Sequence, residues 1–319
     1  GRLQPAPFPA PDIANLLNDW LDAAQLLHWQ EHGQIDFALT LACGARLRAS
    51  AFAHTRGISL VLRLLPEQCP RLDTLGAPPA LSELLAEESG LLLVTGATGS
   101  GKSTTLAALI DSINHTRAEN IITMEDPIEY VHRHEGCIVT QREIPSDVAT
   151  YAEALRSAMR EAPDVILLGE MRDQETIGTA MTAAEMAQLL FSTLHTTGAS
   201  STVDRIIDAF PANQQRQIRM QLSLVLQAVV SQQLVPTVDG GIVPVFEIMT
   251  ATPAIRNLIR EEKTHQIDSV IASSAGAGMR TMDQSLYRLV KEGTISKEVA
   301  LQHAIHQEAL KKRFETEGM

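Results

Sequence analysis

Residues 96–103, with the sequence GATGSGKS, match the pattern G-x-x-x-x-G-K-[ST] of a phosphate-binding loop. The loop follows the apolar run 91–95 and precedes a stretch of helical periodicity, which is the context that this motif requires. Glycines let backbone N–H groups turn inward toward an anion, Lys102 would sit near the β- and γ-phosphates, and the Ser103 hydroxyl would bind Mg²⁺. We therefore predict an ATP site rather than an ordinary glycine-rich turn. Its residues are Gly96, Ala97, Thr98, Gly99, Ser100, Gly101, Lys102, Ser103 and Thr104.

Three further apolar runs end in residues that could act on such a nucleotide. The runs 121–124, 165–168 and 189–194 alternate with helical stretches, which predicts an α/β fold with a mainly parallel sheet covered on both faces. Ligands of such sheets bind beyond the carboxyl ends of the strands. At those ends stand Glu125, Glu170 and His195. We therefore expect two carboxylates and an imidazole at the edge that holds the phosphates.

These three residues suit ATP hydrolysis, which needs charge neutralisation and a positioned water. Glu170 resembles a Walker B acid that holds Mg²⁺ through water or orients the attacking water; the alternative is a solvated acid at a strand end. Glu125 is the candidate general base, or else a turn residue before Pro127. His195 could sense the γ-phosphate, relay nucleotide state or be structural, and the residues alone leave this open.

An arginine that stabilises transition-state charge is the remaining requirement of such a site. The N-terminal part offers Arg56 and Arg63, and each could instead form a surface ion pair of little consequence. Seven residues of strand span about 23 Å. Both side chains can therefore reach one phosphate only if the chain bends, for example at Gly57. The same alternatives hold for three further candidates, Arg142, Arg156 and Arg160.

The chain before residue 80 has a different pattern. Four prolines within 5–11 predict an extended lead-in, and Asp12 is a plausible N-cap of a first helix. Strand-like runs at 35–41, 47–52 and 58–65, joined by tight turns, predict a small antiparallel sheet. The proline-rich stretch 66–79 predicts a linker. We therefore predict a small N-terminal domain at 1–74, incomplete at its start, and a nucleotide-binding domain at 75–319.

The C-terminal part is predicted to be mainly helical. We expect a long helix over 214–232, a hairpin turn at 239–241, a helix capped by Thr252 with Pro253 at its first position, and a last helix capped by Ser296.

The composition limits the partners of the chain. Its 319 residues carry a net charge of -12, which argues against a nucleic-acid partner and against the alternative of a RecA-like nucleic-acid translocase. The three cysteines, Cys43, Cys69 and Cys137, form no C-x-x-C pair, so their spacing indicates neither a structural zinc site nor a disulfide framework and fits a reducing cytoplasm. No apolar run is long enough to cross a membrane, so attachment to one would need partners.

Four motifs follow one another along the chain: a Walker A at 96–103, an Asp box at 122–129 (ITMEDPIE), a Walker B at 164–173 (DVILLGEMRD) and a His box core at 192–197 (STLHTT). In this order they resemble those of the secretion-ATPase superfamily, and specifically its PilT branch of type IV pilus retraction ATPases. The helix at 254–261, AIRNLIRE, matches the element associated with retraction in that branch, although its apolar stripe also fits an ordinary packing helix. The tetracysteine zinc site of extension and type II secretion ATPases is absent, which favours the PilT branch.

The resemblance implies a RecA-like P-loop ATPase domain preceded by a small PAS-like α+β domain. It further implies a homo-hexamer at the cytoplasmic face of the inner membrane, with Mg²⁺-ATP bound between the domains and Arg56 and Arg63 as arginine fingers. Such a motor disassembles pilin through an inner-membrane platform protein. One departure is Ala187-Gln188, where the family usually has Gly-His, so His195 would act alone. A second hypothesis is therefore a PilT-like paralogue with reduced turnover, serving secretion, assembly or nucleotide-gated association.

Overall fold

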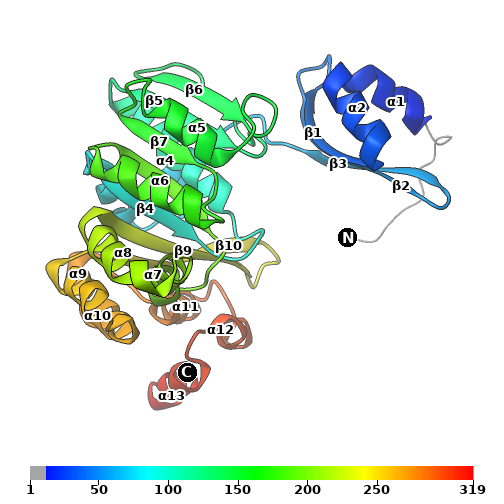
Figure 1. Cartoon of the computed structure of the whole chain (residues 1–319). Coiled ribbons are helices and arrows are strands. Elements are labelled where there is room, and N and C mark those ends of the chain that lie inside the picture. The colour runs from blue at the N-terminus through cyan, green and yellow to red at the C-terminus, as the bar shows by residue number, and fades with distance from the viewer. Residues whose placement is uncertain (1–11, 319) are drawn as a thin grey trace. The chain divides into compact units, whose positions relative to one another are not determined.

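The structure, a computed structural model, describes residues 12–318 and divides the chain into two compact units (Figure 1). The first unit ends at Gln68 and the second begins at Cys69, so the boundary falls within the stretch 66–79 that was predicted as a linker. The extended lead-in predicted within 5–11 lies outside the described residues.

The first unit packs two helices on a three-stranded antiparallel sheet, which confirms the predicted sheet (Figure 1). Its elements are α1 (Ile13–Trp20), α2 (Ala23–His32), β1 (Gln34–Thr40), β2 (Arg46–His54) and β3 (Gly57–Leu64). Asp12 caps α1 as expected, because its carboxylate accepts hydrogen bonds from the N–H groups of Ala14 and Asn15. Leu17 of α1 and Phe37 of β1 are buried in the shared core.

The second unit is built on a seven-stranded sheet. Its strands are β4 (Gly90–Thr95), β5 (Asn120–Glu125), β6 (Ile138–Glu143), β7 (Val165–Leu168), β8 (Leu189–Leu194), β9 (Leu226–Pro236) and β10 (Ile242–Thr250). They lie in the order β10-β9-β4-β8-β7-β5-β6, and every neighbouring pair is parallel except β9 with β10. The predicted α/β fold with a mainly parallel sheet is therefore confirmed. The sequence did not predict strand β6, because this strand lies at the edge and has no continuous apolar run.

Helices cover both faces of this sheet. The helices are α3 (Pro79–Glu83), α4 (Lys102–Thr116), α5 (Tyr151–Ala158), α6 (Gln174–Glu185), α7 (Ala199–Asp208), α8 (Ala212–Val225), α9 (Pro253–Arg260), α10 (Ile267–Ser273), α11 (Met282–Lys291), α12 (Lys297–His303) and α13 (Gln307–Thr316), with 3₁₀ turns η1 (Leu72–Leu75), η2 (Leu84–Ala86), η3 (Thr264–Gln266) and η4 (Ala275–Ala277). Leu91 and Leu93 of β4 point into one core with α5 to α10. Leu92 and Val94 point into the other core with α3 and α4. The continuous apolar run of β4 thus reflects burial on both faces.

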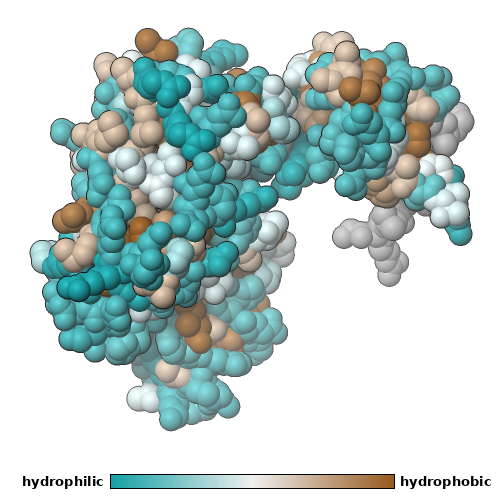
Figure 2. Space-filling model, viewed as in Figure 1, coloured by the Kyte–Doolittle hydropathy of each residue, from teal (hydrophilic) through white to brown (hydrophobic). Residues whose placement is uncertain are grey.

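The surface of the molecule is mainly polar on the face that Figure 2 shows, with apolar residues scattered over it. Among the described residues, no helix combines the length and the apolar character that a membrane crossing requires.

Two predictions for the C-terminal part were wrong. The helix predicted over 214–232 ends at Val225, because the following residues form β9, a strand that lies between β4 and β10 and pairs with both. Ser296 caps α12, but α13 follows, so α12 is not the last helix. The hairpin turn at 239–241 and the Thr252 cap of α9 are confirmed.

We predict that Phe191→Ala lowers the free energy of unfolding of the second unit by about 3–5 kcal/mol, because Phe191 is fully buried on β8 and its truncation leaves a cavity. Urea unfolding followed by far-UV circular dichroism measures this change. Tryptophan fluorescence reports on the first unit, since both tryptophans, Trp20 and Trp29, lie there. Ile242→Ala is the matched control, because Ile242 is 70% exposed. Equal midpoints for the two variants would contradict the prediction.

Candidate nucleotide-binding site

The loop between β4 and α4 forms a narrow cradle that requires glycine at two positions. Gly96 has a φ of 145°, and a Cβ there would lie 2.3 Å from the carbonyl oxygen of Gln232. Gly101 has a φ of 88°, and a Cβ there would lie 2.8 Å from Gln232 Nε2. Gln232 is itself held by Thr105 of α4, whose hydroxyl donates to its Oε1 at 2.7 Å. The backbone shape of the loop therefore depends on β9 as well as on α4.

Two polar side chains of this loop are suited to a phosphate ligand. The ammonium group of Lys102 is buried and donates to the carbonyl oxygens of Gly96 at 2.9 Å and Ala97 at 3.0 Å. The buried hydroxyl of Ser100 has no hydrogen-bond partner within the described part of the chain. The first turn of a helix also directs N–H groups and positive partial charge toward an anion. The loop and the start of α4 therefore fit a polyphosphate.

A line of side-chain contacts leads from this loop across the carboxyl edge of the sheet. Thr98 Oγ1 lies 3.4 Å from His195 Nδ1, and His195 Nε2 lies 3.5 Å from Glu170 Oε2. The other carboxylate oxygen of Glu170 lies 2.5 Å from the guanidinium group of Arg172. The strand order explains these contacts, because β8 lies between β4 and β7 and His195 follows its last residue. The structure thus brings His195 and Glu170 to the phosphate loop.

Glu125 lies farther along the same edge. Its strand β5 follows β7 in the sheet and is three places from β4. Thr123 Oγ1 donates to Glu125 Oε1 at 2.7 Å, and Gln141 Nε2 donates to the same oxygen at 3.1 Å. Glu125 is therefore at the edge that the sequence predicted, and residues of β5 and β6 position its carboxylate.

The arginine candidates fall into two groups. Arg56 and Arg63 belong to the first unit and are exposed; Arg56 immediately precedes β3, and Arg63 is near its other end. Because β3 runs without a break from Gly57, about 23 Å of strand separates them. Each of the other candidates has a nearby partner: Arg142 pairs with Glu161, Arg156 pairs with Glu175, and Arg160 donates to the carbonyl oxygen of Arg156.

Sequence reasoning missed three residues that contact residues of this candidate site or influence their charge: Arg172, Glu129 and Gln232. Arg172 pairs with Glu170, and the hydrogen bond between them raises the pKa of Arg172. Burial lowers the pKa of Lys102, and the negative charges of Glu170 and Glu129 oppose that shift. Gln232 supports the loop from strand β9, whereas the sequence predicted that it lies in a helix. Arg172 and Glu129 both lie inside recognised motifs, so their charge close to the motif acids was the signal that could have found them.

Comparison with known proteins decides the family. The family described as Type II/IV secretion system protein matches residues 30–306. The chain belongs to this family. The type IV pilus retraction ATPase PilT of Pseudomonas aeruginosa is 45% identical over 303 residues, which cover 95% of this chain and 88% of that protein. The uncharacterized protein YggR of Escherichia coli strain K12 is 52% identical over 295 residues, covering 92% of this chain and 90% of YggR.

A solved structure supports the same assignment. The crystal structure of the pilus retraction motor PilT with bound ADP superimposes with a TM-score of 0.89 and 44% identity, covering 94% of this chain and 86% of that one. The predictions of a PilT-type secretion ATPase and of a RecA-like fold are therefore confirmed.

Helix α9 carries the AIRNLIRE segment that resembles the family's retraction element. Ile255 and Ile259 are fully buried, so one face of the helix packs as the apolar stripe predicted. Arg256 fastens α9 to its neighbour α8. Its guanidinium group donates to the carbonyl oxygens of two α8 residues, Ser223 at 2.7 Å and Leu224 at 2.8 Å. The opposite face of α9 is exposed and carries Asn257 and Arg260.

Ala187-Gln188, where the resemblance predicts Gly-His, lies away from the phosphate loop. Ala187 has a φ of 68°, a left-handed conformation that favours glycine, and Gln188 follows it immediately before β8. The buried Gln188 Oε1 has no hydrogen-bond partner in the described chain. His195 follows the other end of β8, so a strand length of about 23 Å separates it from Gln188.

We predict that Lys102→Ala abolishes detectable ATP turnover and weakens nucleotide binding, because it removes the cation that the loop itself carries toward the phosphates. Titration with a fluorescent ATP analogue and a phosphate-release assay measure the two effects. Lys311→Ala is the control, since Lys311 is exposed on α13. Unchanged turnover in Lys102→Ala would show that this loop is not the catalytic phosphate site.

Proposed function

We propose that the chain is the ATPase motor of a type IV pilus machine, where it couples hydrolysis of Mg²⁺-ATP to pilus retraction. The observation that carries this proposal is the continuous line of contacts from the P-loop through His195 to Glu170, in a chain that is 45% identical to PilT. A retraction motor needs both parts: a site that hydrolyses ATP, and a group beside the γ-phosphate whose contacts change when that phosphate leaves.

In this proposal the residues at the sheet edge have separate roles. Lys102 and the loop N–H groups bind the phosphates, and Glu170 or Glu125 orients the attacking water. His195, between Thr98 and Glu170, would report the state of the γ-phosphate to the acid that acts on it. Arg172 pairs with the same carboxylate, so Glu170 would have to release this guanidinium group before it binds Mg²⁺.

The donors at this edge also fit Mg²⁺, a hard cation that prefers oxygen ligands. Ser103 is exposed on the first turn of α4, and the Glu170 carboxylate is at the carboxyl end of β7. These two residues would hold the ion, which when bound neutralises charge on the phosphates.

The assembly that we propose is a cytoplasmic homo-hexamer at the inner face of the membrane. Arg56 and Arg63 of the first unit, which we take to be PAS-like, would supply positive charge to the nucleotide at the subunit boundary. Because β3 holds them apart, they would act on different groups. An inner-membrane platform protein would receive the motion, and the exposed face of α9 is a surface on which the motor could contact it.

A second candidate is a PilT-like paralogue with reduced turnover, serving secretion, assembly or nucleotide-gated association. One observation favours it: Ala187-Gln188 stands where the resemblance to the family predicts Gly-His.

We predict that Glu170→Gln binds ATP but turns it over at least about 10²-fold more slowly, because the amide keeps the shape of the carboxylate and loses its charge. Steady-state phosphate release and nucleotide titration separate the two effects. Glu175→Gln is the matched control, since Glu175 is an exposed acid of α6 paired with Arg156. A normal rate in Glu170→Gln would exclude Glu170 from the chemistry.

The pilus role is tested in cells of the source organism. We expect deletion of the gene to stop the retraction of single labelled pili, and the wild-type and Glu175→Gln genes, but not the Glu170→Gln gene, to restore it. Retraction that continues at its normal frequency in the deletion strain would reject the retraction motor and favour the paralogue.

A further inference from the structure

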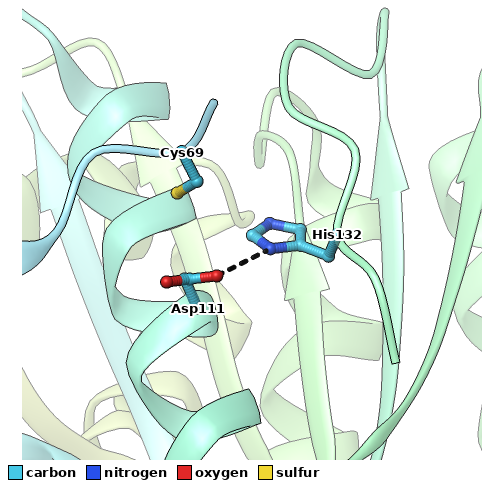
Figure 3. A group of neighbouring side chains, drawn as sticks. All are labelled: Cys69, Asp111 and His132. Atoms are coloured by element: carbon cyan, nitrogen blue, oxygen red, sulfur yellow. Dashed lines mark ion pairs between the residues drawn. The ribbon is translucent and has the colours of Figure 1, made fainter. Parts of the chain in front are cut away.

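Three potential metal ligands from distant parts of the second unit meet beside α4. Cys69 lies just before η1, Asp111 is on α4, and His132 lies between β5 and β6. One ligand atom of each residue lies within 4.8 Å of those of the other two. Figure 3 shows the three side chains directed toward a common space. The contacts of the phosphate site use other residues, so this cluster needs its own explanation.

The imidazole of His132 is buried without a hydrogen bond to its Nδ1. The side chain is only 2% exposed, and within residues 12–318 this nitrogen has no hydrogen-bond partner. Asp111 Oδ1 lies 3.8 Å away, which is beyond hydrogen-bond range. Zinc holds nitrogen and oxygen ligands at about 2.0–2.2 Å each. His132 Nδ1 and Asp111 Oδ1 would therefore have to move only slightly closer together to bind the same ion.

Burial affects the pKa values of two side chains in this cluster. Burial lowers the pKa of His132, and the charge of Asp111 opposes that shift. Burial and then the charge of Asp111 raise the pKa of the Cys69 thiol to about 12. A metal ion reverses this balance because it displaces the thiol proton.

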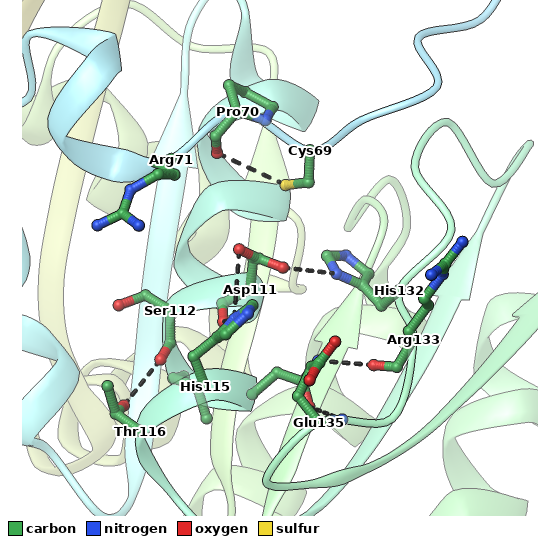
Figure 4. Close-up of polar contacts among 12 residues, drawn as sticks. Cys69, Pro70, Arg71, Asp111, Ser112, His115, Thr116, His132, Arg133 and Glu135 are labelled. Carbon is green, nitrogen blue, oxygen red and sulfur yellow. Dashed lines mark hydrogen bonds and ion pairs between the residues drawn. The ribbon is translucent and has the colours of Figure 1, made fainter.

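Neighbouring residues hold two of the ligands in place (Figure 4). His115 Nδ1 lies 2.8 Å from the carbonyl oxygen of Asp111 and 3.5 Å from its Oδ2, so the other carboxylate oxygen is the one toward His132. Asn114, also on α4, donates to the carbonyl oxygen of Arg133 at 2.7 Å and thereby fixes the segment that carries His132. A site on such supported elements is pre-organised for its ligand.

We propose that Cys69, Asp111 and His132 bind one divalent transition-metal ion and that this ion is Zn²⁺, whose preferred sulfur, nitrogen and oxygen ligands they supply. A water molecule would complete the four-coordinate shell. Binding forms one metal–sulfur bond and releases the thiol proton to solvent, with no oxidation or reduction. The ion would fasten the first residue of the second unit to the helix that begins at the P-loop. This inference does not depend on the pilus role.

The test is metal binding by the full chain, purified without a histidine tag and stripped with a chelator. We expect one equivalent of Zn²⁺ to bind in competition with a chromophoric chelator, and Co²⁺ in its place to show a thiolate-to-metal charge-transfer band. Cys69→Ser and His132→Gln should each weaken Zn²⁺ binding by at least about tenfold. Cys69→Ser should also abolish the band, and it is the decisive variant because Cys69 is only half-buried and serine keeps its shape.

Two control variants separate this site from adventitious binding. Cys43→Ser removes an exposed cysteine, and His28→Gln breaks the stacked pair with His32 on α2, which could itself take a metal. Both variants should still bind one equivalent of Zn²⁺ as tightly as the wild-type chain does. The proposal is overturned if the wild-type chain binds no stoichiometric Zn²⁺, if the Co²⁺ form lacks the thiolate band, or if Cys69→Ser binds Zn²⁺ as tightly as the wild-type chain. Far-UV circular dichroism of each variant checks that it is folded.

Discussion

The parallel pairing of β4, β8, β7 and β5 is the constraint on which the candidate site depends. Parallel strands end at one edge, so residues separated widely in the sequence must meet there. Because β8 lies between β4 and β7, His195 falls between the P-loop and Glu170, and its two ring nitrogens face Thr98 and Glu170. Hydrogen bonding of the backbone thus sets the order of the side chains along the edge that carries the phosphate loop, and the helices packed on both faces support that edge.

Much of this arrangement could be predicted from the sequence because it follows from local patterns. Uniformly apolar runs identify strands buried on both faces, and the residues after them identify the edge. The order of the strands does not follow from such patterns, so the sequence could not tell that Glu170 contacts His195 while Glu125 lies beyond β7. Gln232 shows the same limit: its segment has helical composition, but pairing with β4 and β10 makes it a strand. Tertiary hydrogen bonds overrode local preference there.

The cluster of Cys69, Asp111 and His132 is an arrangement that ligand spacing in a sequence does not indicate. Close cysteine pairs are the signal of compact zinc modules, and this chain has none. Here the potential ligands come from three segments that only the folded sheet and α4 bring together. Burial in the same packing raises the pKa of the Cys69 thiol and lowers the pKa of the His132 imidazole. A folded scaffold can therefore bring potential metal ligands together without any local motif.

Ala187 and Gln188 destabilise the local fold and lie away from the phosphate loop. Ala187 adopts a left-handed conformation that costs a non-glycine residue of order 1–3 kcal/mol, and Gln188 Oε1 is buried without a partner among the described residues. Both lie before β8, whereas His195 follows it, and about 23 Å of strand lies between. Within one chain, the line from Thr98 through His195 to Glu170 is complete without a residue at 188. Ala187-Gln188 therefore leaves the contacts beside the phosphate loop in place, and it bears first on the stability of the turn that enters β8.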